Sequence, residues 1–455
     1  METIILIIFI LGYLAITLEH NLKVDKLVPA LLMMALAWAC VAIGIDGFET
    51  WFDSHHHSLN ENFGSLNHEA KMGIMESTLL HHFGKTCEIL IFLIGAMTIV
   101  EIIDHFNGFS TIKRYIKTNK KSTLLWIMSI LAFILSAIID NLTATIVLIT
   151  ILRKLLPSNK DRIWFAGLII IAANAGGAWS PIGDVTTTML WIGDKVSTLK
   201  LIEYLIIPSL VCMIIPTTIA SYLKPFRGTF EAPPSEGKEN SKGPLMLYLG
   251  LSLIVFVPVF KTVTHLPPYV GMMLSLSIVA LVAELITARE FSMSSIGDEL
   301  STQDAGHHKS PTFGALSKIE MPSILFFLGI LMTVAALESL GMIFVFGNDV
   351  MQSGMNLDLF VMLLGGGSAV IDNVPLVAAS MGMFQEPLDS TVWHFIAYAA
   401  GTGGSMLIIG SAAGVVAMGM EKISFFWYLK KIGWLALIGY LAGGGVFILF
   451  EKFLF

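Results

Sequence analysis

The chain has 455 residues, of which 55% are hydrophobic and 13% are charged, and its formal net charge is -7. Soluble domains carry roughly 25% charged residues, so this chain has about half the charge needed to face water. Apolar runs near the length of a membrane helix recur along the whole sequence. The composition excludes a soluble protein and predicts an all-α polytopic membrane protein.

Hydropathy predicts eight plain spans along the chain. The first has neither a basic leader nor a small-residue cleavage pattern, so we expect a retained helix and not a signal peptide. The three cysteines, Cys40, Cys87 and Cys212, have no metal-binding or redox spacing and are expected to be reduced, structural thiols. The predicted spans lie near residues 2–18, 27–45, 86–104, 201–223, 244–260, 269–287, 321–346 and 431–453.

Two further apolar stretches are interrupted by an Asp-Asn pair. Residues 123–156 are too long for one crossing and break at Asp140-Asn141, whereas residues 357–386 break at Asp372-Asn373. Lys and Arg flank the first stretch on both sides, at positions 113–121 and 153–162, which predicts that both flanks are cytoplasmic. The flanks of the second stretch have no Lys or Arg. We therefore predict two re-entrant hairpins, one entering from each side.

Gly-rich patches divide two other stretches, residues 163–192 and 391–420, which we expect to be broken transmembrane helices. Each half of the chain then reads span, span, loop, span, hairpin, broken span, span. A hairpin crosses zero times, so each half makes an odd number of crossings and the second copy is upside down. This predicts two inverted repeats, residues 1–223 and 244–455, joined by a cytoplasmic linker at 224–243.

The same topology places both termini in the periplasm and the His-rich 46–85 loop outside. Such a loop is compatible with pH sensing, with adventitious metal binding, or with a merely solvated segment. The sequence also supports a duplication. The segment from Asn174 to Asp184 aligns with Gly401 to Ser411, and residues 137–141 align with residues 369–373 in the same order.

The two Asp-Asn pairs are the strongest chemical signal. An unpaired carboxylate at membrane depth costs at least about 2.5–3.5 kcal/mol, and a helix break there leaves backbone groups that must be buried or line a cavity. Both costs coincide at each pair. Carboxylate, amide and backbone oxygens suit a hard cation, so the pairs predict a cation site. The alternative is a structural turn cap.

Polar side chains near the breaks extend this predicted site. Asp184 and Asn174 have Ser411 and Gly401 as counterparts, so we expect ligands mainly from the first half. The alternative for the small residues is helix packing, and Ser368 fits either role. The predicted set is Asp140, Asn141, Asn174, Asp184, Thr186, Thr187, Ser368, Asp372, Asn373, Thr402 and Ser405.

Other acids at membrane depth are candidates for a proton path. Glu338 is the preferred candidate, followed by Glu101 and Asp104. Asp104 and Glu338 each lie nine residues after a glycine in similar segments and are expected to be repeat equivalents. For Asp104 an interfacial position is the alternative.

At these residues the chain resembles the NhaD family of sodium/proton antiporters, within a wider ion-transporter superfamily that includes arsenite permeases and dicarboxylate carriers. The most specific segments are residues 139–143, 174–187 and 367–375. The resemblance implies exchange of Na⁺ and Li⁺ for H⁺ across a bacterial inner membrane, adds Thr143 to the site, and implies Na⁺ ligation by Asp140, Asn141, Asn174 and Asp184. Relatives with this layout are often homodimers whose hairpin-bearing part moves like an elevator.

Three alternatives follow from the same sequence. An oxyanion or dicarboxylate carrier is disfavoured because the predicted site holds three Asp and no Lys or Arg. An arsenite permease is harder to exclude, since neutral arsenite tolerates carboxylates. A channel or membrane-embedded enzyme is disfavoured by the paired breaks and by the absence of His-Glu-x-x-His and Gly-x-Ser-x-Gly motifs. We expect no cofactor and no nucleic-acid partner, and activity that rises at alkaline pH.

Overall fold

A computed structural model describes residues 1–53, 58–113, 116–230, 242–294, 310–352, 354–370 and 372–453. These residues are mainly helical, with one short antiparallel ribbon in which Trp51 pairs with Asn60. The His55–His57 run of the predicted outer loop and part of the predicted linker (231–241) lie outside the described residues.

The first half contains the ribbon and ten α-helices within the described residues. Its elements are α1 (Glu2–Thr17), α2 (Glu19–Leu22), α3 (Leu27–Ile43), η1 (Ile45–Gly47), β1 (Trp51–Asp53), β2 (Ser58–Asn60), η2 (Phe63–Ser65), α4 (His68–His105), α5 (Ser110–Lys113), α6 (Lys121–Ile139), α7 (Asn141–Leu155), α8 (Asn159–Gly177), α9 (Val185–Ile192), α10 (Thr198–Ser221) and η3 (Lys224–Phe226).

The second half contains eleven α-helices and no ribbon among its described residues. Its elements are α11 (Gly243–Thr264), α12 (Pro268–Ser294), α13 (Pro311–Leu316), α14 (Met321–Ser339), α15 (Met342–Gln352), α16 (Leu357–Gly367), α17 (Asn373–Met383), α18 (Thr391–Gly403), η4 (Gly404–Met406), α19 (Ala412–Glu421), α20 (Phe425–Tyr428), η5 (Leu429–Gly433) and α21 (Trp434–Phe453).

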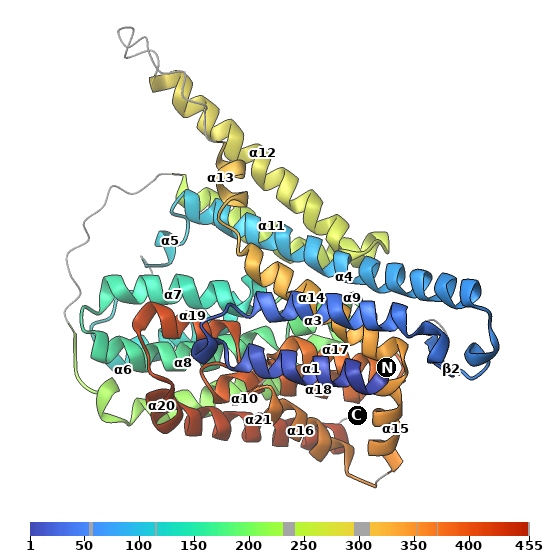
Figure 1. The fold of residues 1–455 in the computed structure, drawn as a ribbon. Coiled ribbons are helices and arrows are strands. Elements are labelled where there is room, and N and C mark those ends of the chain that lie inside the picture. Colours follow the sequence, from blue (N-terminus) through green and yellow to red (C-terminus); the bar gives the residue numbers. More distant parts are fainter. Residues whose placement is uncertain are drawn as a thin grey trace.

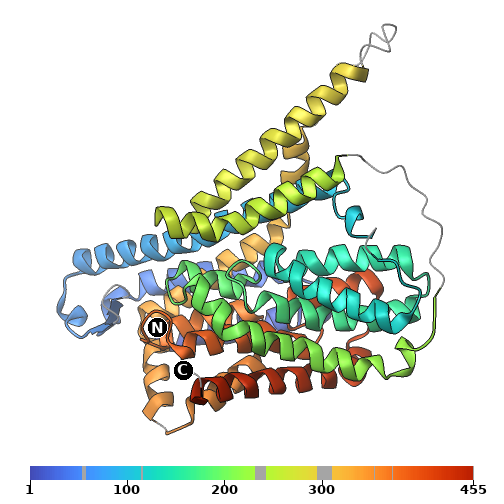
Figure 2. The same ribbon diagram turned by 180° about the vertical axis from the view of Figure 1, so that it is seen from behind.

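The helices form two groups that lie side by side (Figure 1). Helices α4, α11, α12 and α13 pack together along one side, and α12 projects beyond the rest of the molecule. The other group contains the interrupted helices, with α10 and α21 packed on each other. Both chain termini lie at the same end of the molecule, as the reverse view in Figure 2 also shows.

Seven helices of the described chain are long and apolar enough to cross a membrane. Six of them correspond to predicted plain spans: α4, α10, α11, α12, α14 and the run from α20 to α21. The seventh is α6, the first arm of a predicted hairpin, while α1 and α3 are shorter apolar helices of 16 and 17 residues. The chain is therefore a multi-pass membrane protein.

Two sequence predictions about helix limits are wrong. The predicted 46–85 loop becomes helix at His68, because the Asn67 side chain caps α4 by accepting a hydrogen bond from Ala70 N at 2.9 Å. Hydropathy alone missed this extension, since its many polar and charged residues lower the mean hydropathy although they are compatible with a helix. The predicted 321–346 span is divided between α14 and α15 at Gly341, which has φ +72°, a conformation that favours glycine.

The helix breaks lie where the Asp-Asn pairs and Gly-rich patches predicted them. Asp140 alone separates α6 from α7, and these two helices pack on each other as a helical hairpin. Residues 368–372 separate α16 from α17, and both of these helices pack on α18. Residues 178–184 interrupt the helix formed by α8 and α9, and residues 407–411 separate η4 from α19.

Matching glycines pack each broken helix against the first arm of its hairpin. A Cβ at Gly176 would lie 2.2 Å from the Phe133 carbonyl oxygen, and one at Gly403 would lie 2.0 Å from the Gly365 carbonyl oxygen. Two serines at matching positions also make equivalent hydrogen bonds. Their Oγ atoms donate to carbonyl oxygens one helix away: Ser136 to Ala173 at 2.6 Å and Ser368 to Ala400 at 2.9 Å. The two break regions thus share one local architecture.

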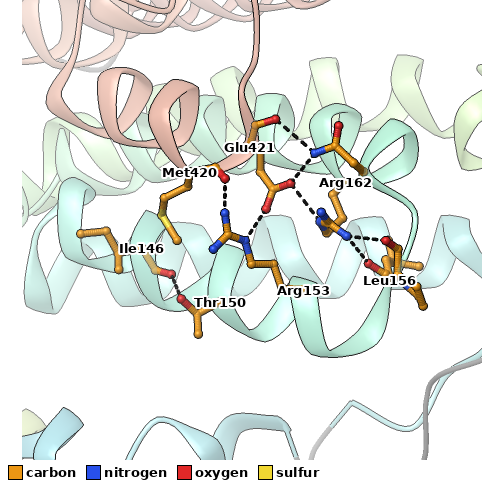
Figure 3. Close-up of polar contacts among 9 residues, drawn as sticks. Ile146, Thr150, Arg153, Leu156, Arg162, Met420 and Glu421 are labelled. Carbon is orange, nitrogen blue, oxygen red and sulfur yellow. Dashed lines mark hydrogen bonds and ion pairs between the residues drawn. The ribbon is translucent and has the colours of Figure 1, made fainter.

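A buried carboxylate joins the two halves at the end of the molecule that carries Arg153 and Arg162, which we call the basic end (Figure 3). The fully buried Glu421 side chain, at the end of α19, accepts hydrogen bonds from Arg153 Nε at 2.7 Å and Arg162 Nε at 2.9 Å. Asn159 Nδ2 donates to the same carboxylate at 2.9 Å, and Arg153 also bonds the Met420 carbonyl. This cluster fixes the ends of α7 and α8 to α19.

We predict that Glu421→Gln lowers the free energy of unfolding by about 3–5 kcal/mol, because it leaves two arginines without their buried partner. Thermal unfolding of the purified protein measures this loss. Glu203→Gln is the matched control, since its ion pair with Lys200 is exposed and its loss should leave the stability almost unchanged. Equal destabilisation by the two substitutions would contradict the assigned role of Glu421.

Candidate functional site

Asp140 is held in an unusual backbone conformation at the turn between α6 and α7. Its φ of 78° and ψ of 160° lie in a region that is essentially restricted to glycine. The side chain caps α7: Oδ1 accepts from Thr143 N at 2.8 Å and Oδ2 accepts from Thr143 Oγ1 at 3.0 Å. The carboxylate is thereby fixed at the helix N-terminus, where the helix dipole favours negative charge.

The neighbouring amide links the first hairpin to both broken helices. Asn141 Nδ2 donates to Asn174 Oδ1 at 3.0 Å, and Asn174 Nδ2 donates to Ser411 Oγ at 3.0 Å. All three side chains are buried. Asn141, which is 6% exposed, can then direct its own amide oxygen to a ligand. Asn174 therefore bridges a hairpin of one half and the broken helix of the other.

The second Asp-Asn pair makes the reciprocal connection. Asn373 Nδ2 donates to Asp184 Oδ2 at 3.1 Å, across the boundary between the halves. Asp184 is buried at the start of α9, where Thr186 N lies 3.4 Å from Oδ1. It also lies within electrostatic reach of both Asp140 and Asp372. The structure thus brings the three predicted aspartates into one electrostatic environment.

Gly401 makes room for the Asp184 carboxylate. It occupies the position that aligns with Asn174, and a Cβ there would lie 3.2 Å from Ala178 Cβ and 3.5 Å from Asp184 Oδ2. A side chain as long as asparagine would displace the carboxylate. The space that Asp184 needs is therefore a steric reason for glycine, and not asparagine, at position 401.

The predicted hydroxyl residues are buried around these groups, but most of them bond to nearby backbone. Thr187 Oγ1 donates to the Asp184 carbonyl at 2.9 Å, whereas the buried Thr186 Oγ1 has no partner among the described residues. Thr402 donates to the Tyr398 carbonyl at 2.6 Å and Ser405 to the Thr402 carbonyl at 2.6 Å. Thr186 therefore lies beside the Asp184 carboxylate with a hydroxyl that is not bonded to the backbone.

Lys26 is a site residue that the sequence analysis missed. Its Nζ lies 3.4 Å from Asp372 Oδ2, so a lysine is present beside the predicted aspartates, contrary to the expectation that none would be. No sequence signal identifies this pair, because 346 positions separate its members and Lys26 lies just before an apolar span, where lysines commonly mark the interface.

A cavity of about 370 Å³ connects the first hairpin to the basic end of the molecule. Thr143 lines it together with Glu101 and Asp104, two of the proton-path candidates. Its other charged lining residues are Glu320, Lys113, Lys154 and Lys318. These two candidates therefore share a cavity with Thr143, the residue whose backbone N–H and hydroxyl bond Asp140.

The third proton-path candidate lines a different cavity. Glu338 lies in a space of about 260 Å³ with His81, His82, Lys85 and Lys195. Both cavities contact α4, at points roughly 25 Å apart along the axis given a rise of 1.5 Å per residue. The structure does not bring Glu338 together with Glu101 and Asp104.

We predict that Gly401→Val lowers the free energy of unfolding by about 1–3 kcal/mol, because the added methyl groups overpack the contact with Ala178 and Asp184. Gly445→Val is the matched control, since nothing lies within 4 Å of a Cβ there. Helix propensity favours both substitutions, as both glycines lie in helices. Thermal unfolding compares them, and an unchanged Gly401→Val protein would contradict the predicted contact.

Comparison with known proteins places the chain in a transporter family. A family model described as "Citrate transporter" matches residues 4–395. Sodium/proton antiporter 2 of Arabidopsis thaliana is 38% identical over 96% of this chain and 97% of its own length. Sodium/proton antiporter 1 of the same plant is 41% identical, with 96% of this chain and 70% of the relative covered.

Bacterial relatives and a solved structure agree with this placement. The Na(+)/H(+) antiporter NhaD of Vibrio cholerae is 31% identical over 93% of this chain and 87% of the relative. The crystal structure of the YdaH transporter of Alcanivorax borkumensis matches with a TM-score of 0.54 and 12% identity, covering 93% of this chain and 98% of that one, which shows a shared fold. The chain belongs to the citrate transporter family and, within it, to the NhaD sodium/proton antiporters.

Proposed function

We propose that the protein exchanges Na⁺ or Li⁺ for H⁺ by alternating access, with cation and proton competing for buried carboxylates. One observation carries this proposal. Asp140 and Asp184 stand at two adjoining helix breaks within electrostatic reach of each other, and amides of both halves contact the network around them. The plant and bacterial relatives are named sodium/proton antiporters, which supports Na⁺ and H⁺ as the exchanged ions.

Competition follows from the charges at this site. Two ionised carboxylates in one buried site repel each other, and either a proton or a dehydrated cation relieves that repulsion. We place Na⁺ at Asp140, Asn141, Asn174 and Asp184, which supply carboxylate and amide oxygens. Loading with one ion therefore opposes loading with the other, so a pH gradient drives cation movement.

Alternating access is supported by the two cavities that contact α4. One extends from Thr143 to the basic end, and the other contains Glu338 between α4 and the α9–α17 region. We propose that they are the two access routes, with Glu101 and Asp104 on the cytoplasmic proton path and Glu338 on the outer one. Transport by this scheme rises toward alkaline pH, where fewer protons compete.

The proposed topology consists of two inverted repeats with re-entrant hairpins. The paired glycine contacts and the paired serine hydrogen bonds support it, because the same positions of each half make them. We place both termini in the periplasm of a bacterial inner membrane, on the strength of the basic flanks and the bacterial relatives. Assembly as a homodimer remains a prediction from the family resemblance.

A carrier of citrate or another anion is the second candidate function. Two observations favour it: the description of the matching family model and the presence of Lys26 near the site. The Lys26 charge is already compensated by Asp372, however, and the described site adds two further aspartates. An anion would meet net negative charge there, so we rank this function below cation exchange. Arsenite remains the neutral substrate to be tested.

The test measures dequenching of a pH-sensitive dye in inverted vesicles after separate additions of Na⁺, Li⁺, K⁺, citrate and arsenite. We expect responses to Na⁺ and Li⁺ only. Asp140→Asn and Asp184→Asn should each reduce the Na⁺ response by more than about tenfold. Removing a group that only supports an ion's ligands typically costs about tenfold or more, and these two residues are proposed to be ligands themselves.

Asp194→Asn is the matched control, because this side chain is 76% exposed and lies outside the site. It should retain most of the wild-type response. Full Na⁺-dependent proton movement in Asp140→Asn would exclude Asp140 as the shared ligand. A response to citrate or arsenite without Na⁺ would favour the second candidate function.

A further inference from the structure

Lys26 and Asp372 connect two parts of the molecule that are far apart in sequence. Asp372 precedes α17 at the second helix break, and Lys26 immediately precedes α3. The Lys26 ammonium lies 3.4 Å from the carboxylate and 4.4 Å from the centre of the Phe326 ring on α14. The two charged side chains are only 24% and 15% exposed. The ammonium is therefore held between a carboxylate and an aromatic face, which attracts cations.

The surroundings of this pair form a small cavity of about 280 Å³. Glu19, from α2, is the other charged residue that lines it, and Tyr13, from α1, contributes a buried hydroxyl without a partner among the described residues. Met418 and Gly419 line the same space from α19, near the basic end where Glu421 binds its arginines. Asp372 thus faces a cavity that a small cation can enter.

The aspartates of the two Asp-Asn pairs consequently have different partners. Asp140 caps α7 through Thr143 and has no cationic side chain within ion-pair distance among the described residues. Asp372 makes no side-chain cap, and its negative charge is met by Lys26. A carboxylate that already pairs with an ammonium gains little from a second monovalent cation, because the first charge cancels most of its field.

We propose that Lys26 is a tethered competitor of the transported cation: it holds Asp372 in the conformation seen here and must leave before Asp372 can bind a cation. This inference rests on the proposed function. Lys26 immediately precedes α3, which packs on α1 and α14, whereas Asp372 precedes α17 of the second hairpin. A shift of that hairpin relative to α3 breaks the pair, so cation binding at Asp372 is linked to that shift.

The test compares Lys26→Met, Lys26→Arg, Asp372→Asn and the double variant Lys26→Met/Asp372→Asn. In inverted vesicles, Lys26→Met should lower the KM for Na⁺ by about fivefold, a typical coupling between two sites. Lys26→Arg retains the charge and should keep a KM near that of wild type. The double variant should have the same KM for Na⁺ as Asp372→Asn alone, because without the Asp372 charge there is no carboxylate for which Lys26 and Na⁺ compete. Lys23→Met, at an exposed neighbouring lysine, is the matched control.

A merely structural ion pair gives a different result. Lys26→Met would then lower the maximal rate or the melting temperature while leaving the KM for Na⁺ unchanged, and this outcome overturns the inference. Asp372→Asn would also fail to cancel its effect.

A second readout separates this inference from the proposed function. At a fixed Na⁺ concentration, Na⁺ raises the melting temperature of the purified protein by more when its affinity for the folded state is higher. If wild type moves no protons with Na⁺ but Lys26→Met shows the larger Na⁺-dependent rise, the proposed function fails while the competition stands. If transport is present and the rises are equal, the competition fails alone.

Discussion

A helix that breaks within an apolar, buried segment must bury its freed backbone groups against other protein atoms, and the rest of this structure depends on that constraint. Each broken helix meets it by packing backbone on backbone against the first arm of its hairpin. Gly176 and Gly403 permit that approach, because any side chain there would overlap a carbonyl oxygen. The break loops are then held side by side, and their polar side chains share one buried space.

The resulting site uses both halves but treats them unequally. The Asp184 carboxylate accepts a hydrogen bond directly from the hairpin residue Asn373. At the matching position, Ser411 accepts its hydrogen bond from Asn174 and not from a hairpin residue. Gly401 provides the space that the Asp184 carboxylate occupies. At the hairpin tips, Asp140 is held in a strained backbone conformation by its own cap, and Asp372 is held by Lys26. Two similarly built break regions thus carry a single, unequal set of candidate ligands.

The sequence predicted the parts of this arrangement that depend on local pattern. Apolar runs located the long helices, and the Asp-Asn pairs and Gly-rich patches located the breaks, because each feature perturbs its own segment. The sequence did not predict the Lys26–Asp372 and Glu421–Arg153 pairs, whose members are 346 and 268 positions apart. Hydropathy also missed the start of α4, where polar and charged residues lower the mean hydropathy and the Asn67 cap marks the helix N-terminus.

The central claim is that a cation and protons compete for the same buried carboxylates. Calorimetric titration of the purified protein with Na⁺, in buffers that differ in ionisation enthalpy, counts the protons released on binding. Competition predicts proton release that accompanies Na⁺ binding at neutral pH and diminishes as the pH rises. Binding of Na⁺ with no release of protons at any pH would contradict the account.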